Sequence, residues 1–122
     1  MAKGDDIRER LVNFAIAVMD LCDQLPKTTA GTHISGQLLR SGTSAAPNYA
    51  EARGAESSRD FMHKLGIALK ELNETEVWLD MVFHRGMVEA NQIGKLRQEC
   101  GELCRILAAS VKTMEKRIGK PG

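Results

Sequence analysis

Apolar residues recur three and four positions apart through most of the chain, and this spacing is typical of one buried face of an α-helix. A first row, which starts near Asp5 and ends before Pro26, consists of Ile7, Leu11, Phe14, Val18, Leu21 and Leu25. A row with the same spacing near the C-terminus consists of Ile93, Leu96, Cys100, Leu103, Leu107, Val111, Met114 and Ile118. The pattern therefore predicts long amphipathic helices over about residues 5–25 and 89–118.

A third helix is predicted over residues 58–85. Its start is indicated by Ser57 and Asp60, which have the spacing of a capping box with Asp in place of the usual Glu or Gln. Gly86 provides the C-terminal stop, because glycine readily takes the left-handed conformation that ends many helices. The apolar row between these ends is Phe61, Leu65, Ala68, Leu72, Leu79 and Val82.

The remaining segment contains a stretch of small residues, RSGTSAAPNYAEARG (40–54), with the composition of a loop. Two rows of helical spacing nevertheless cross it: Ile34, Leu38, Ala45, Tyr49 and Ala52, and beside them Gln37, Ser41, Ser44, Asn48 and Glu51. We therefore expect one helix over residues 29–55, kinked at Pro47. The proline ring removes one backbone hydrogen bond and crowds the carbonyl of Thr43, at a cost of about 3 kcal/mol. Small side chains compensate by letting a neighbouring helix approach closely, with hydroxyl groups and Asn48 bonded to the freed carbonyls.

Four helices joined by short connections predict an all-α fold, an antiparallel up-down-up-down four-helix bundle. The low aromatic content of 4% favours a core of aliphatic side chains over a β-sandwich. For a chain of 122 residues we expect a single domain, with the bundle at 5–118 and disordered tails at 1–4 and 119–122.

The first and third helices carry more apolar surface than one bundle needs to bury. Val12, Ile16 and Met19 form a second row on the first helix, and Trp78 and Met81 lie off the main row of the third. A helix that is apolar over more than half of its circumference requires a second partner. These five residues are the candidate contacts between subunits of a homo-oligomer. A flank of the core is the alternative for Trp78 and Met81.

The net charge is +1, so the chain as a whole gives no electrostatic case for nucleic-acid binding. The charge is uneven, however: residues 5–25 are acidic and residues 89–120 are basic. Within the basic segment Arg105, Lys112 and Lys116 share one face, and they are the candidate nucleic-acid contacts. A solvated helix face, or attraction between the acidic first helix and the basic last one, is the plainer alternative.

The segment QLLRSGTSAAPNYAEA (37–52) contains the pattern R-S-x-x-S-x-x-x-N-x-x-E, formed by Arg40, Ser41, Ser44, Asn48 and Glu51. Together with the downstream SRDFMHKLGIALKELNETEVWLDMV (58–82), it resembles the bacterial four-helix-bundle family encoded in intervening sequences of 23S rRNA genes. The resemblance covers about residues 6–118 and implies a bundle that assembles into a ring, commonly a homopentamer. It also implies a relationship to the accessory variability determinant proteins of diversity-generating retroelements, which are thought to engage a reverse transcriptase and nucleic acid.

The pattern residues allow two interpretations. Arg40 and Glu51, with Asn48 between them, can satisfy a polar seam between helices or subunits and fix its register. Alternatively, they surround the central opening of a ring. The resemblance brings no catalytic residue to this chain.

Metal and catalytic chemistry find little support in the sequence. A di-iron bundle needs two Glu-x-x-His pairs and further carboxylates, whereas this chain offers a single Asp-x-x-His, Asp60 to His63. Neither a metal nor another cofactor is therefore expected. The three cysteines, Cys22, Cys100 and Cys104, are expected to be buried, reduced thiols.

These observations favour a non-enzymatic oligomeric scaffold whose partners are copies of itself and RNA, DNA or a nucleic-acid enzyme. The alternatives are a purely structural self-assembling module without a ligand, and a small enzyme that uses Cys100, Cys104 or His63 in a cleft. No secretory signal opens the chain, and its apolar run at residues 11–22 is too short to span a bilayer. We therefore expect a cytoplasmic protein without a membrane partner.

Overall fold

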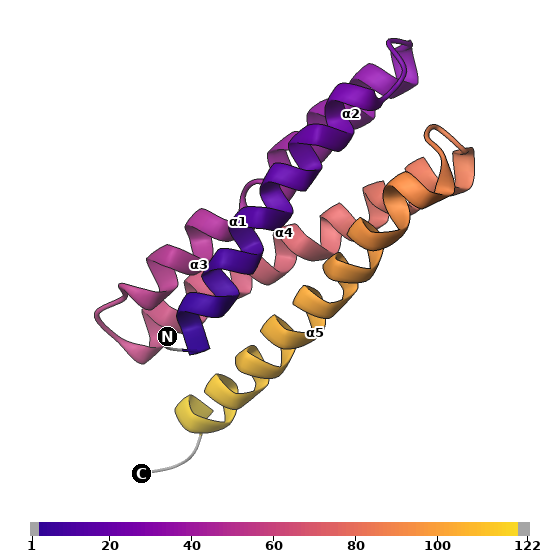
Figure 1. Cartoon of the computed structure of the whole chain (residues 1–122). Helices are drawn as coiled ribbons and strands as arrows, with labels where there is room; N and C mark the ends of the chain where they lie inside the picture. The colour runs from indigo at the N-terminus through magenta and orange to yellow at the C-terminus, as the bar shows by residue number, and fades with distance from the viewer. Residues whose placement is uncertain (1–2, 120–122) are drawn as a thin grey trace.

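The computed structural model of the chain describes residues 3–119. Within this range all regular structure is helical and there is no β-strand. The helices are α1 (Lys3–Gln24), α2 (Thr29–Gly42), α3 (Ala45–Arg53), α4 (Ser58–Arg85) and α5 (Ala90–Gly119) (Figure 1). The predicted all-α, four-helix architecture is confirmed, with the second of its four rods divided into α2 and α3.

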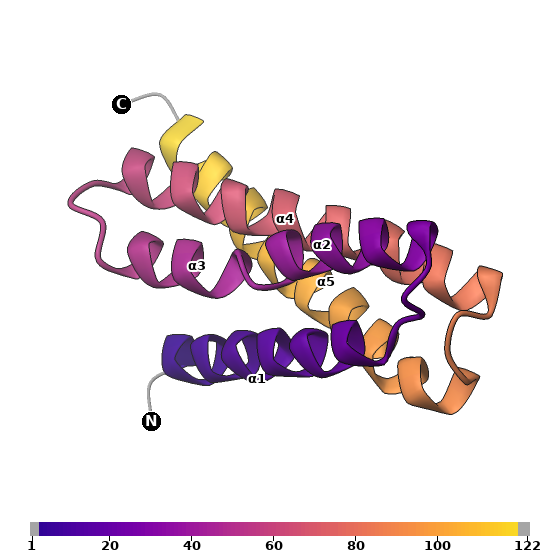
Figure 2. The ribbon, with the colours of Figure 1, turned by 90° about the horizontal axis from the view of Figure 1, so that it is seen from above.

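The rods alternate in direction along the bundle. Both α1 and α4 pack against α2, α3 and α5. The α2/α3 rod and α5 therefore each lie between α1 and α4. Seen from above, α2 and α3 continue one another along α1, whereas α5 runs obliquely to α1 (Figure 2). A hollow of about 360 Å³ lies between α1 and α5. The seam between these two helices is therefore the open side of the bundle.

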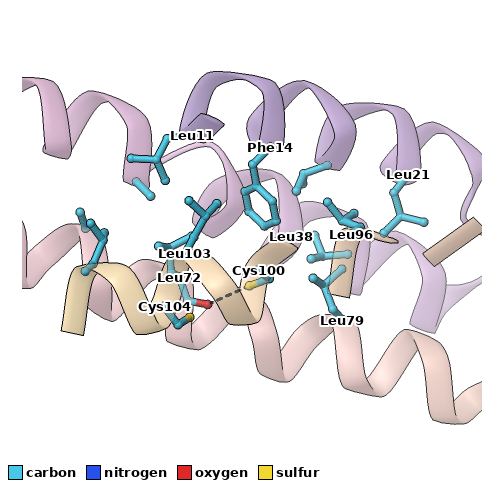
Figure 3. Packing of buried hydrophobic residues seen from close by; sticks show 14 of the residues in the cluster. Leu11, Phe14, Leu21, Leu38, Leu72, Leu79, Leu96, Cys100, Leu103 and Cys104 are labelled. Carbon is cyan, nitrogen blue, oxygen red and sulfur yellow. Dashed lines mark hydrogen bonds between the residues drawn. The ribbon is translucent and has the colours of Figure 1, made fainter. Parts of the chain in front are cut away.

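Buried side chains from all four rods form one core (Figure 3). The predicted row of α1 is buried from Leu11 to Leu25, and that of α4 from Leu65 to Val82. The row of α5 is buried only from Ile93 to Leu107. Its last three members are half-buried, and these are Val111, Met114 and Ile118.

The last turns of α5 reach beyond the start of α1. Arg10 of α1 lies 2.5 Å from Glu99 and 3.7 Å from Glu102 of α5. Because the two helices are antiparallel, Lys3, seven residues before Arg10, is about level with residues 106–109. We call residues 110–119 the α5 overhang. Ser110 and Thr113 of the overhang line a hollow together with Gly4 and Ile7 of α1. The apolar row of the overhang is accordingly only half-buried.

The prediction of one continuous helix over residues 29–55 is wrong. α2 ends at Gly42, and Thr43 and Ser44 form a turn before α3 begins at Ala45. Pro47 is thereby the third residue of α3, in the first turn, where a backbone N–H has no partner inside its own helix. The break lies where the proline ring was expected to crowd the Thr43 carbonyl. Restarting the helix there avoids the cost of a proline in a helix interior.

The small residues allow the close packing that the sequence predicts. A Cβ atom placed on Gly42 would lie 2.7 Å from Cγ1 of Val18, so α2 approaches α1 more closely than a side chain would permit. Ala45 and Ala52 of α3 are buried in the core. Small side chains thus bring the second rod close to its neighbours.

Side chains also satisfy the carbonyls next to the break. Thr43 Oγ1 donates to the carbonyl of Leu39 at 2.5 Å, and Asn48 Nδ2 donates to the carbonyl of Ser44 at 2.9 Å. Both carbonyls also accept a backbone N–H at 3.3 Å, from Thr43 and Asn48 respectively. The hydroxyl group and Asn48 therefore bond to carbonyls near the break as expected, but these carbonyls are not ones that the turn has freed.

Helix α4 begins and ends as predicted. Ser57 Oγ accepts a hydrogen bond from the N–H of Asp60 at 3.0 Å, which is the predicted cap. Gly86 follows the helix with a φ of 68°, in the left-handed region that glycine tolerates.

The predicted tails overlap the ends of two helices. α1 already begins at Lys3, so the tail over 1–4 is wrong for its last two residues, and residues 1–2 lie outside the described range. α5 extends to Gly119, and the rest of the tail expected over 119–122 is likewise outside that range. No helix between residues 3 and 119 has the length and hydropathy needed to cross a membrane.

Candidate functional site

The pattern residues lie along the seam between the α2/α3 rod and α4. Arg40, close to the end of α2, donates to Glu71 at 3.1 Å and also to Glu74, and it bonds to Gln37 at 3.4 Å. Trp78 Nε1 donates to the same Glu74 at 3.1 Å. A single guanidinium group therefore binds two carboxylates of α4 and joins α2 to α4 just before the break.

Beside this contact a pair of hydroxyl groups is completely buried. Ser41 and Thr75 are both 0% exposed, and their oxygens are 2.8 Å apart. Thr75 Oγ1 also lies 2.7 Å from the carbonyl of Glu71. Since a buried hydroxyl group is costly without a partner, this pair fixes the register of α2 against α4.

The other pattern residues continue the seam beyond the break. Asn48 Nδ2 lies 3.1 Å from Ser44 Oγ, and Glu51 lies 3.6 Å from Lys64 of α4. Arg40 and Glu51 have separate partners on α4 and do not form a joint site. Arg40, Ser41 and Glu51 make a polar seam with α4. Ser44 and Asn48 bond to one another within the second rod, so the five residues do not form one compact cluster.

Of the residues considered for catalysis, Cys100 and Cys104 lie together on α5, but His63 of α4 does not join them. All three cysteines are buried free thiols. Cys100 Sγ lies 3.5 Å from the carbonyl of Leu72, and hydrogen bonding to Cys104 together with burial raises the pKa of Cys100. His63 is exposed and lies nine residues before Leu72, about 13 Å along α4. Across residues 3–119 no three His, Cys, Asp or Glu side chains are grouped to hold a metal ion.

The candidate nucleic-acid contacts are all exposed along α5. Arg105 lies beside Glu76 of α4, because a Cβ atom on Gly101 would be 3.3 Å from Arg105 Nη1 and 3.5 Å from Glu76 Oε2. Glu76 therefore offsets part of the Arg105 charge. Lys112 and Lys116 lie on the α5 overhang, where the chain is most basic.

The open side of the bundle carries one ion-pair cluster. Arg10 of α1 donates through two nitrogens to Glu99 of α5, at 2.9 and 2.5 Å. Bonding to Glu99 raises the pKa of Arg10. In this contact the base is on α1 and the acid on α5, which is opposite to the attraction expected from the net charges of the two helices.

Four of the five candidate interface residues are exposed. The exposed fractions are 37% for Val12, 49% for Ile16, and 45% for both Met19 and Met81. Trp78 differs because its ring is half-buried against the core and lies 5.9 Å from the ring of His33.

Two further exposed apolar residues were not predicted, Leu39 (45%) and Val77 (52%). Val77 lies one turn before Met81. Leu39 lies between Ser35 and Gly42, and these two contact α1, so Leu39 borders the groove between α1 and α2. Both could have been found in the sequence as apolar residues off the main row of their helix. We call Val12, Ile16, Met19 and Leu39 the α1/α2 patch, and Val77 and Met81 the α4 patch.

The polar seam and both apolar patches fall within a match to a known family. The sequence model described as 23S rRNA-intervening sequence protein matches residues 5–109. The chain belongs to this family. The match to the 23S rRNA-intervening sequence proteins ends where the α5 overhang begins.

A solved structure supports the same assignment. It is the crystal structure of a protein of unknown function from the S23 ribosomal protein family of Bacteroides thetaiotaomicron. The two sequences are 33% identical, the alignment covers 91% of this chain and 99% of that one, and the TM-score is 0.82. No curated protein matches the chain. The predicted membership of the 23S rRNA-intervening sequence proteins is confirmed, and neither comparison assigns an activity.

Proposed function

We propose that this protein is a non-enzymatic scaffold that assembles into a ring-shaped homo-oligomer, a pentamer by its family resemblance, and that its partner is nucleic acid. The observation that carries the proposal is the exposed apolar surface. Six large apolar side chains are between 37% and 52% exposed, in the α1/α2 patch and the α4 patch. Exposed apolar residues gathered in this way are typical of protein–protein contact surfaces.

The position of the patches favours a ring over a two-fold dimer. A two-fold dimer uses the same surface on both subunits, whereas a head-to-tail contact joins two different surfaces. The two patches lie on different rods. A head-to-tail contact leaves one patch free at each end of a dimer, and further copies add until the assembly closes.

The basic face of α5 supports nucleic acid as the partner. Arg105, Lys112 and Lys116 are exposed on one side of the helix. One copy of this face is weak, because the net charge of the chain is only +1. Several copies in a ring bind together with a much greater combined strength.

Light scattering and a salt titration test the two parts of the proposal. We expect one oligomer over a range of protein concentrations, and binding of single-stranded RNA or duplex DNA that weakens steeply as salt rises. Replacement of Lys112 and Lys116 by Gln should weaken binding, whereas the control double variant Arg8→Gln/Lys27→Gln should not. A monomer at all concentrations would contradict the scaffold. An oligomer that binds neither nucleic acid at low salt would contradict only the partner.

A further inference from the structure

The outward faces of α1 and α4 match in length, and their end charges are opposite. We infer that they are the two halves of one interface, in which α1 of one copy docks on α4 of a second copy of this chain. The inference rests on the proposed assembly and names the surfaces that make it.

The α1 half is an exposed row with acidic ends. Glu9, Val12, Ile16, Met19 and Asp23 follow one another at spacings of three and four and are all exposed. Glu9 and Asp23 lie seven residues on either side of Ile16. The row is about 21 Å long. It presents an apolar centre between two negative charges.

The α4 half has a similar plan with basic residues at its ends, although the exposed Asn73 stands where the α1 row has Val12. Lys70 lies seven residues before Val77, and His84 lies seven residues after it. Met81 lies between Val77 and His84. All four are exposed. This row is also about 21 Å long. His84 is followed by Arg85, so the C-terminal end of the row gains a permanent positive charge.

Acidic residues of α4 do not make this row negative, because they lie on either side of it and are paired with arginines of other helices. Glu71 and Glu74 bind Arg40 of α2, and Asp80 lies 2.9 Å from Arg97 of α5. The outward row of α4 is thereby left apolar and basic.

Pairing unlike halves is favoured over pairing like halves. If α1 met α1, the acidic ends would face one another, and if α4 met α4, the basic ends would do so. Like charges brought together at an interface are costly, and opposite charges select the correct partner. Docking α1 on α4 also buries both apolar centres, with Leu39 at the border of the contact.

A mixing experiment with two single variants tests the pairing. Ile16→Glu disables the α1 half and keeps the α4 half, and Val77→Glu does the reverse. Each variant alone should be monomeric by light scattering, and an equimolar mixture should form a 1:1 dimer through the two intact halves. Ala109→Glu, an exposed site on α5, is the control and should assemble as the wild type does. Circular dichroism should show that each variant is folded.

The charges provide a second measurement. Glu9→Lys with Asp23→Lys should weaken assembly at least tenfold in dissociation constant, and so should Lys70→Glu with His84→Glu. All four changes in one chain should restore it, because every interface then pairs opposite charges again.

The outcomes separate this inference from the proposed function. A wild-type oligomer whose two single variants fail to pair, or a Val77→Glu variant that still assembles alone, overturns the α1–α4 pairing and leaves the scaffold standing. A wild-type protein that is monomeric throughout overturns both.

Discussion

The α2/α3 rod is closed against α4 by buried hydroxyl groups and paired charges, whereas the opposite seam, between α1 and α5, encloses a hollow of about 360 Å³. On the tight side Ser41 meets Thr75 in the core, and Gly42 lets α2 lie against Val18 of α1. On the open side the ion pairs of Arg10 span helices that run obliquely to one another (Figure 2).

This difference shows where the chain tolerates change. The tight side surrounds the break in the second rod, where side chains bond to backbone carbonyls and to one another. Each residue there has a specific partner at a specific distance. The open side has specific contacts too, such as the Arg10–Glu99 pair, but its hollow leaves room for changes in side-chain volume.

The largest effect is expected from filling the closest contact on the tight side. Gly42→Val should lower the free energy of unfolding by about 3 kcal/mol, because its side chain has no space beside Val18. Ala17→Val, which adds two methyl groups' worth of volume beside the hollow on the open side, should be nearly neutral. Urea unfolding measures both.

A control within α2 separates volume from helix propensity. Gly36 is exposed and has no atom within 4 Å of its Cβ position, so Gly36→Ala should raise stability by up to about 1 kcal/mol. Equal unfolding free energies for Gly42→Val and the wild type would show that the tight side is not tight.

The buried hydroxyl pair gives the next largest effect. Thr75→Val should cost about 1–3 kcal/mol, since it leaves the Ser41 hydroxyl group buried without its partner. Adding Ser41→Ala should recover part of this loss, so that the double variant costs less than the sum of the single ones. Strict additivity in this double-mutant cycle would rule out the bond as a stabilising contact.

Removal of an ion pair should lower stability by a smaller amount, and the loss should be larger on the tight side than on the open side. Arg40→Leu should cost about 1 kcal/mol, because it leaves Glu71, only 14% exposed, unpaired next to Glu74. Arg10→Leu on the open side should cost about half as much. Unfolding at low and high salt checks this, since salt should reduce both losses. A larger loss for Arg10→Leu would reverse the comparison.

The smallest effect is expected at alkaline pH. Burial raises the pKa of both Tyr49 of α3 and Cys22 of α1, so the folded state holds these protons more strongly than the unfolded state does. Their contribution to stability is complete below the unfolded pKa values and is lost as the pH rises above about 9. Unfolding between pH 7 and 11 measures the decline. Tyr49→Phe should remove the part of this decline that occurs at the highest pH. If Tyr49→Phe lost stability with pH as the wild type does, Tyr49 would not be the cause of that part.

The helical rows were predictable because burial follows periodicity, but the break was not. Thr43 and Ser44 keep right-handed helical dihedral angles, with φ and ψ of −99° and −3° and of −82° and −30°. The rows of apolar and polar residues therefore continue in register across a turn that interrupts the hydrogen bonds. Pro47 marked the position, but periodicity alone cannot distinguish such a turn from a kink.

The residues of the second rod that form the polar seam could be predicted from the sequence, but their partners on α4 could not. Arg40 and Ser41 stand out in the sequence, but Glu71 and Thr75 become their partners only through the register of α4 against α2. The same limit applies to Val111, which has the spacing of a core residue. Periodicity does not show that Val111 is only half-buried, at the edge of the core.

The interruption after Gly42 leaves α3 with nine residues, fewer than an isolated helix needs to persist in water. The helical state of α3 therefore depends on its packing against the rest of the bundle. The exchange of its amide protons reports whether α3 is packed in place. Exchange with heavy water should reach α3 through local opening while the middle of α4 stays protected until the whole domain unfolds.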